Sequence, residues 1–222
     1  MREAAPYNPL DKNNIGASVA EALLARRPAT LNHLRSFSGA GIYAIYYTGK
    51  FPAYAAIAER NREGRFEAPI YVGKAVPQGA RKGAGGLDAT TTRALHKRLG
   101  EHAESIRATT LDDADFHCRY LVVDDIWIPL GESLLIAKFA PIWNSIIDGF
   151  GNHDPGSGRY KGMRPRWDVL HPGRAWAAKC AERPESTTVI LSEVKEYLRS
   201  TPPPASQRFY AEQLQARYVP DS

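Results

Sequence analysis

Runs of hydrophobic positions along the chain predict three strands and two helices between residues 41 and 140. Residues 41–50, 69–73 and 116–123 are rich in β-branched and aromatic residues, which predicts strands. Residues 90–107 carry apolar side chains at helical spacing, and a second helix is predicted from about residue 129 to residue 140. The order strand, strand, helix, strand, helix predicts a small α/β unit, with a three-stranded sheet on which the helices pack.

The remaining segments carry weaker patterns. Residues 17–36 predict one or two short helices broken at Pro28. The glycine-rich stretch 76–89 predicts a mobile loop. Residues 188–200 fit either a strand or a short helix, and residues 206–218 predict a terminal helix.

Composition narrows the class of protein. The chain has 222 residues, of which 43% are hydrophobic and 24% charged, and this excludes a disordered or fibrous protein. No stretch reaches the roughly 18 apolar residues of a membrane span, and no secretory signal is visible at the N-terminus. With only two cysteines, neither a disulfide framework nor a four-cysteine zinc site is expected. We therefore expect a cytoplasmic protein.

Charge is unevenly distributed along the chain. The net charge is +5, and basic blocks at 50–107 and 156–183 flank an acidic block at 109–155. Basic blocks of this kind suggest a polyanionic partner. Charge alone leaves a second interpretation open, in which these blocks are solvated lysine and arginine faces.

Four short motifs follow one another on the predicted elements: Gly41-Ile42-Tyr43, Tyr71-Val72-Gly73-Lys74, Arg98 with His102, and Glu132 with Asn144. Their residue types and order resemble the signature of the GIY-YIG nuclease family over roughly residues 39–146. The resemblance implies an α+β core with a three-stranded antiparallel sheet. It also implies an N-terminal helical segment at 1–38 and a DNA-contacting C-terminal extension at 147–222.

The enlarged segments of the core indicate a branch of that family. Twenty-seven residues separate Tyr43 from Tyr71, so insertions are expected at 48–68 and 76–89. Insertions beside the active site are suited to base readout. The chain is therefore similar to the type II restriction endonucleases of the family, which implies site-specific cleavage of double-stranded DNA at a palindromic, GC-rich site.

The resemblance assigns a role to each motif residue, and the chemistry of phosphodiester hydrolysis agrees with these roles. Arginine suits bidentate phosphate contact, which favours Arg98 as the phosphate ligand. Glu132 is the expected ligand of Mg²⁺, with Mn²⁺ as a substitute, because a single Mg²⁺ commonly takes one or two carboxylates. Asn144 would support Glu132 or a metal-bound water.

The tyrosines are assigned to the attacking water. Tyr43 would be the general base or a base relay, and His102 would assist it. Tyr71 and Lys74 would position the water and the phosphate. Because the pKa of a free tyrosine is about 10, a Tyr43 base needs nearby cations that favour its phenolate. Lys74, Arg98 and the metal could supply them, and the cleavage rate would then rise with pH across the neutral range.

Basic residues outside the motifs are the expected DNA ligands: Arg81, Lys82, Arg159, Lys161, Arg164 and Arg166. Symmetric cutting of a palindrome implies a homodimer, and a restriction role implies a cognate DNA methyltransferase in a prokaryotic cell. Two alternatives stay open. One is a structure-selective repair or mobile-element nuclease, and the other is a catalytically idle DNA-binding protein on the same fold.

Overall fold

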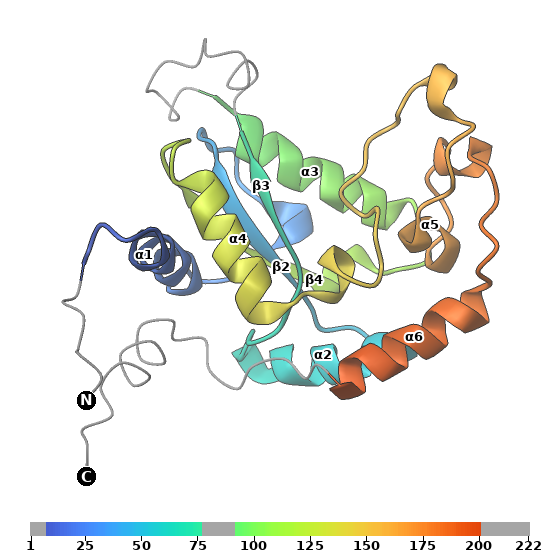
Figure 1. The fold of residues 1–222 in the computed structure, drawn as a ribbon, viewed down its shortest axis with the longest axis horizontal. Helices are drawn as coiled ribbons and strands as arrows, with labels where there is room; N and C mark the ends of the chain where they lie inside the picture. Colours follow the sequence, from blue (N-terminus) through green and yellow to red (C-terminus); the bar gives the residue numbers. More distant parts are fainter. Residues whose placement is uncertain (1–7, 77–91, 201–222) are drawn as a thin grey trace, which may run out of the picture.

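The fold is mixed α/β, with helices on both sides of one sheet (Figure 1). The computed structural model describes residues 8–76 and 92–200. Its main elements are α1 (Lys12–Leu24), β1 (Ala29–Thr30), β2 (Gly41–Tyr47), α2 (Ala55–Asn61), β3 (Pro69–Ala75), α3 (Ala94–Arg107), β4 (Phe116–Val122), α4 (Ile128–Phe139), α5 (Arg166–Leu170) and α6 (Thr187–Ser200).

The strands form one antiparallel sheet in the order β1-β4-β2-β3. The three predicted strands and the two predicted helices, α3 and α4, are all present, which confirms the mixed α/β class. The sheet differs from the prediction in having a fourth strand, β1, which pairs with β4 through Ala29 and Thr30. The helical prediction for 17–36 is confirmed by α1, which ends at Leu24, and by a short 3-10 helix at Leu31–His33, but it is wrong for Ala29–Thr30, which form β1.

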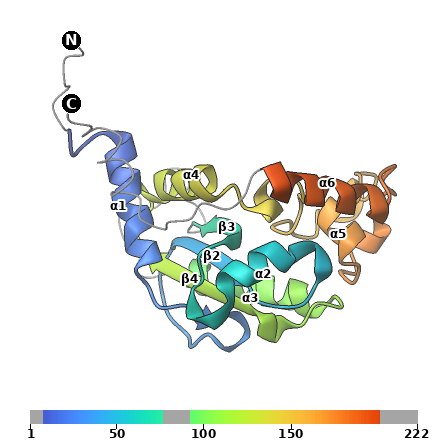
Figure 2. The same ribbon diagram turned by 90° about the horizontal axis from the view of Figure 1, so that it is seen from below.

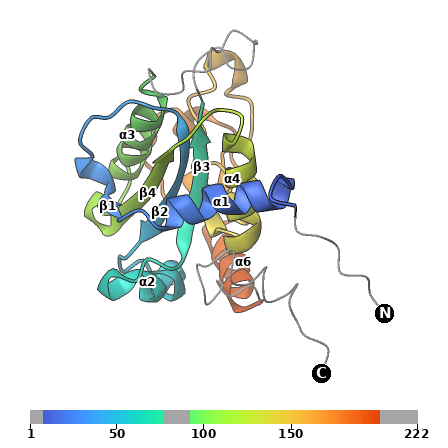
Figure 3. The same cartoon turned by 90° about the vertical axis from the view of Figure 1, so that its left-hand side faces the viewer.

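Strand β2 lies in the centre of the sheet, and all seven of its residues are buried. Because successive side chains of a strand point to opposite faces, its residues serve two cores. Tyr43, Ile45 and Tyr47 face the cluster that contains α3, and the intervening residues face α1 and α4. Figures 2 and 3 show α1 and α4 on one side of the sheet and α3 on the other.

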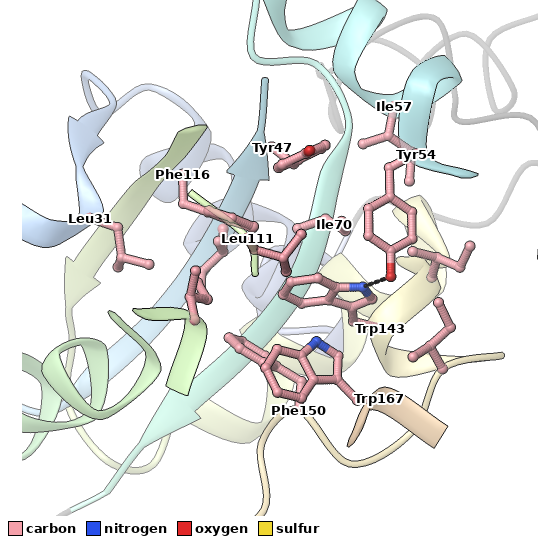
Figure 4. Packing of buried hydrophobic residues seen from close by; sticks show 14 of the residues in the cluster. Leu31, Tyr47, Tyr54, Ile57, Ile70, Leu111, Phe116, Trp143, Phe150 and Trp167 are labelled. Carbon is pink, nitrogen blue, oxygen red and sulfur yellow. Dashed lines mark hydrogen bonds between the residues drawn. The ribbon is translucent and has the colours of Figure 1, made fainter. Parts of the chain in front are cut away.

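The core on the α3 side is unusually aromatic and includes the C-terminal segment (Figure 4). Trp143, Phe150 and Trp167 are buried together there, with Trp143 and Trp167 rings edge to face at 5.7 Å. Residues of α6 join the same cluster. The described part of the predicted extension, 147–200, is thus packed onto the core.

The insertion predicted at 48–68 forms helix α2 and delivers Tyr54 into this core. The Tyr54 hydroxyl lies 2.7 Å from Nε2 of buried His171 and accepts a hydrogen bond from Trp143. Segment 188–200, left open from sequence, belongs to the helix α6. The predicted loop 76–89, from residue 77 onward, and the predicted helix 206–218 lie outside the described residues. None of the described helices has the length and apolarity needed to cross a membrane.

Candidate active site

Two buried side chains from different elements form a close pair beneath the sheet surface. The Tyr43 hydroxyl of β2 lies 2.6 Å from Nε2 of His102 on α3. Burial lowers the pKa of His102 well below its ordinary value, helped by the nearby charge of Arg98, so the imidazole is neutral near pH 7. A neutral Nε2 can accept the phenol hydrogen, and Tyr43 then donates to His102.

The pKa of Tyr43 moves in the direction opposite to the one predicted. Burial raises it well above the ordinary value, and the neighbouring phenol of Tyr71 adds to the increase. The positive charge of Arg98 lowers it, as expected from sequence, but by less than burial raises it. Tyr43 is therefore a protonated phenol near neutral pH, hydrogen-bonded to a neutral histidine.

Strand β3 brings a second tyrosine beside this pair. The rings of Tyr43 and Tyr71 lie 6.2 Å apart, and Tyr71 is only partly buried. Gly73, opposite Tyr43 in the neighbouring strand, makes this arrangement possible. A Cβ atom at Gly73 would lie 2.5 Å from the Tyr43 hydroxyl oxygen and 3.0 Å from the Tyr71 ring. The absence of a side chain at residue 73 leaves the space that the Tyr43 hydroxyl occupies.

Replacing Gly73 with alanine is expected to displace the Tyr43 hydroxyl from His102. Overpacking a filled core typically costs about 1–3 kcal/mol, so we expect a comparable loss in the free energy of unfolding. Chemical denaturation measures this loss. Gly100→Ala is the control, because a Cβ there would meet no atom within 4 Å. Equal stability of Gly73→Ala and the wild type would contradict this packing.

Arg98 connects the tyrosines to the surface. Its charge lowers the pKa of both Tyr43 and Tyr71, and its guanidinium donates to the Gly151 carbonyl and to Glu101 at 3.3 Å. The arginine also borders an open groove of about 570 Å³. Lys74, Arg93 and Lys97 line that groove with it, so the groove is suited to an anion.

Glu132 and Lys74 meet on the α4 side of β3. Lys74 Nζ lies 2.6 Å from Oε2 of Glu132, and the Glu132 side chain keeps 16% of its surface exposed. The charge of Glu132 raises the pKa of both Tyr43 and Tyr71. Glu132 lies on the α4 side of β3, and the Tyr43 and Tyr71 rings lie on the α3 side. Only the edge strand β3 separates them, so the charge of the carboxylate still acts on both tyrosines.

The donor set around Glu132 is compatible with one hydrated Mg²⁺. Among the described residues, no three His, Cys, Asp or Glu side chains gather to enclose a metal ion. Mg²⁺ does not require such an enclosure, since it is commonly held by one or two carboxylates, waters and substrate phosphate. A partly exposed glutamate beside a cationic groove supplies the protein share of that set.

The Asn144 side chain, predicted to support Glu132 or a metal-bound water, hydrogen-bonds to the backbone of β3. Its side-chain amide donates to the Val72 carbonyl and accepts from the Val72 backbone N–H, both at 2.8 Å. These bonds pair the free edge of β3 as a neighbouring strand would. Asn144 thus holds the strand that carries Tyr71 and Lys74.

Sequence reasoning missed the segment 150–153, which closes the site from the side. The Phe150 ring stacks on His102 with centroids 4.5 Å apart, Gly151 accepts from Arg98, and His153 contacts the Arg98 guanidinium. A Cβ at Gly151 would lie 2.5 Å from the Tyr71 hydroxyl. The signal in the sequence is a glycine- and aromatic-rich stretch shortly after Asn144, which has no periodicity.

Four of the six predicted DNA ligands lie in the described part of the chain, and they divide into two groups. Arg159 and Lys161 are exposed on the segment beyond His153. Arg164 donates to the Ala177 carbonyl and Arg166 to Glu185 and Glu193, so the structure favours a packing role for these two over the predicted DNA contact. Arg81 and Lys82 lie outside the described residues.

The comparison with known families agrees with this geometry. A family model described as "Eco29kI GIY-YIG domain" matches residues 35–198, which is most of the chain. No curated protein matches the chain. The match confirms the resemblance and extends it beyond residue 146, into the segment that packs on the core. The chain belongs to the Eco29kI GIY-YIG domain family, a restriction endonuclease family of GIY-YIG nucleases.

Proposed function

We propose that the protein is a Mg²⁺-dependent type II restriction endonuclease that hydrolyses double-stranded DNA at a specific site. The observation that carries the proposal is that the buried Tyr43–His102 pair lies beside Arg98, and that Arg98 and Lys74, the ion-pair partner of Glu132, line one cationic groove. These groups provide a proton acceptor, a phosphate ligand and a metal ligand. A phosphodiester hydrolase requires these functions.

The proposed proton path runs through Tyr43 to His102. As the water gives a proton to the Tyr43 oxygen, the phenol passes its own hydrogen to the neutral Nε2 of His102. The resulting hydroxide attacks phosphorus, the bond to the leaving oxygen breaks, and that oxygen takes a proton from solvent. The imidazolium of His102 then passes its proton back to the Tyr43 oxygen as Tyr43 releases the proton taken from the water to solvent, which restores the starting state. This relay does not require a stable phenolate.

Arg98 has two positions in this scheme. In the free protein it interacts with the Tyr43 phenol, which is fully buried. A phosphate in the groove would draw the guanidinium away, because arginine binds phosphate with two parallel hydrogen bonds. That movement would give the water access to Tyr43, so that substrate binding and exposure of the proton acceptor would occur together.

Lys74 and Tyr71 complete the proposed site. Lys74 now pairs with Glu132, and in the complex its ammonium would contact the phosphate or the water instead. Glu132 would hold the Mg²⁺, which when bound supplies positive charge to the phosphate. Tyr71, partly exposed and next to Arg98, would orient the water.

The restriction role itself is tested by digestion of unmethylated plasmid DNA in the presence of Mg²⁺. We expect discrete fragments whose ends map to one palindromic, GC-rich sequence, and protection by a cognate methyltransferase. A smear, or cutting only at branched structures, would favour the repair or mobile-element alternative. DNA binding without any cleavage would favour the idle DNA-binding protein. Sedimentation of the protein with cognate duplex would test the proposed homodimer.

Arg159 and Lys161 are the described residues from which we expect DNA phosphate contact. Replacing both with alanine should weaken duplex binding uniformly across sequences. It should also reduce the slope of log affinity against log salt by about one for each phosphate that is no longer neutralised. Titration of labelled duplex at several salt concentrations measures the slope. Lys195→Ala with Arg199→Ala, two exposed cations of α6, forms the matched control. An unchanged slope in the Arg159 and Lys161 variant would place these residues away from DNA.

A further inference from the structure

Arg174 is a buried cation whose role the proposed mechanism does not include. Its side chain is 4% exposed, and it pairs with Asp168, which is 1% exposed. Nε donates to Oδ1 of Asp168 at 2.7 Å, and Nη2 contacts Oδ2. The two parallel bonds fix the plane of the guanidinium against α5.

The other edge of the same guanidinium binds the backbone of the segment that closes the active site. Nη1 donates to the carbonyls of Phe150 and Asn152, each at 3.1 Å, and Nη2 donates to Gly149 at 2.9 Å. All five N–H donors of the arginine therefore have a partner. Three backbone carbonyls within residues 149–152 are thus tied to one side chain.

Two aromatic rings lie against the guanidinium. Its central carbon lies 4.6 Å from the centroid of the Trp167 ring and 4.7 Å from that of the Trp176 ring. Trp167 belongs to the main core, so it anchors the arginine to the rest of the protein. Cation–π contacts of a desolvated arginine add to its hydrogen bonds.

The segment that Arg174 holds touches the site at three points. Phe150 stacks on His102 with an interplanar angle of 18°, Gly151 accepts the hydrogen bond of Arg98, and a Cβ atom at Gly151 would meet the Tyr71 hydroxyl. The charge of Arg174 also lowers the pKa of His102. A displacement of residues 149–152 would therefore change the contacts of both His102 and Arg98.

We propose that Arg174, fixed by Asp168, is a positioning residue that holds segment 149–152 so that His102 and Arg98 stay aligned with Tyr43. The inference rests on the proposed function for its effect on rate, but the geometric part stands without it. Lysine cannot replace the arginine, because an ammonium has three donors and cannot serve the carboxylate and three carbonyls in one plane.

The test compares Arg174→Lys with the wild type. The substitution keeps the charge, so that geometry alone changes. The first readout is the imidazole C–H resonances of His102 in histidine-labelled protein, because the stacked Phe150 ring shields them. We expect these resonances to shift downfield while those of His117, on β4, stay in place. The second readout is single-turnover cleavage of unmethylated plasmid with Mg²⁺, where a misalignment of about 1 Å is expected to cost about 10²-fold.

Arg119→Lys is the matched control. Arg119 is also buried, donates to the carbonyls of Arg26 and Phe66, and lies over the Tyr46 ring, but it points to the opposite face of the sheet. We expect it to leave the His102 resonances and the cleavage rate unchanged. Trp176→Leu, at a half-buried ring, should shift the His102 resonances in the same direction as Arg174→Lys but by less.

The outcomes separate the two levels of the proposal. If Arg174→Lys does not fold by circular dichroism, the Trp176→Leu spectrum decides. Unchanged His102 resonances in the folded variant would overturn the positioning role, whatever the cleavage result. If the His102 resonances shift in Arg174→Lys but the wild-type protein cuts no DNA, the positioning of His102 is supported and only the proposed function is rejected.

Discussion

Glu132→Gln is expected to abolish DNA cleavage while duplex binding stays largely intact. The substitution keeps the size of the side chain and removes the charge that would hold Mg²⁺. The charge of Glu132 raises the pKa of both Tyr43 and Tyr71, which shows that the carboxylate lies near both. The cations that line the groove remain, so the protein should still bind the DNA backbone. Plasmid digestion and a duplex titration, both with Mg²⁺, measure the two effects.

Loss of folding is not expected to explain the result. The ion pair of Glu132 with Lys74 is partly exposed on the lysine side, and exposed pairs typically contribute about 0.2–1 kcal/mol. Glu59→Gln is the control, because Glu59 also pairs with exposed cations, Arg62 and Arg65, but lies on α2. Cutting by Glu132→Gln at the wild-type rate would remove the metal-ligand role from Glu132.

The fold of the core was predictable because each motif lies on an element with a strong local pattern. Tyr43 and Tyr71 sit in β-branched, aromatic runs, and His102 follows Arg98 by one helical turn, so their elements could be placed from sequence. Strand β1 could not, because two residues give no periodicity and its pairing with β4 depends on tertiary contacts.

The parts of the site that sequence reasoning missed have long-range causes. Phe150, Gly151 and Arg174 lie in segments without helix or strand, and their contacts join residues 22 to 53 positions apart. Arg166 illustrates a second limit of the sequence. Its basic neighbours suggested a DNA surface, but its partners Glu185 and Glu193 are distant in sequence and neutralise it within the fold. Net charge along the chain reports no such pairing.

The pKa of Tyr43 shows the same limit, since burial decides it and burial is a property of the packed sheet. From sequence, the nearby cations predicted a phenolate and a rate that rises with pH. In the structure the phenol is fully buried and its pKa is raised. The histidine beside it has a lowered pKa and is neutral. For this reason the proposed mechanism uses a proton relay in place of a free phenolate.

Tyr43→Phe is expected to lower the single-turnover cleavage rate by about 10²–10⁴-fold, the usual contribution of a general acid–base group. The ring that packs in the core remains, so the protein should fold. The lost hydrogen bond leaves buried His102 without its partner, at a cost of about 1–3 kcal/mol in the free energy of unfolding. Rate and stability are measured on the same preparation, by cleavage and by chemical denaturation.

Tyr54→Phe separates these two effects. Tyr54 is a second buried tyrosine that lies within hydrogen-bond distance of a histidine, His171, whose pKa burial lowers to about 3. The variant should lose a similar amount of stability, since it also leaves buried polar groups without a partner. It should keep the wild-type cleavage rate, because this pair lies in the core away from the cationic groove. Equal rate losses in both variants would attribute the effect of Tyr43→Phe to stability.

The pH dependence distinguishes relay from phenolate. The pKa of His102 lies well below 6.5, so its proton-accepting form is fully populated above that pH. The pKa of Tyr43 lies well above 10, so its phenol stays protonated up to pH 9. A relay therefore predicts a level wild-type rate from pH 6.5 to 9, whereas attack through a free phenolate predicts a tenfold increase per pH unit. A wild-type rate that climbs in this way, and a folded Tyr43→Phe protein that retains the climb and most of the rate, would together assign the base role to a group other than Tyr43.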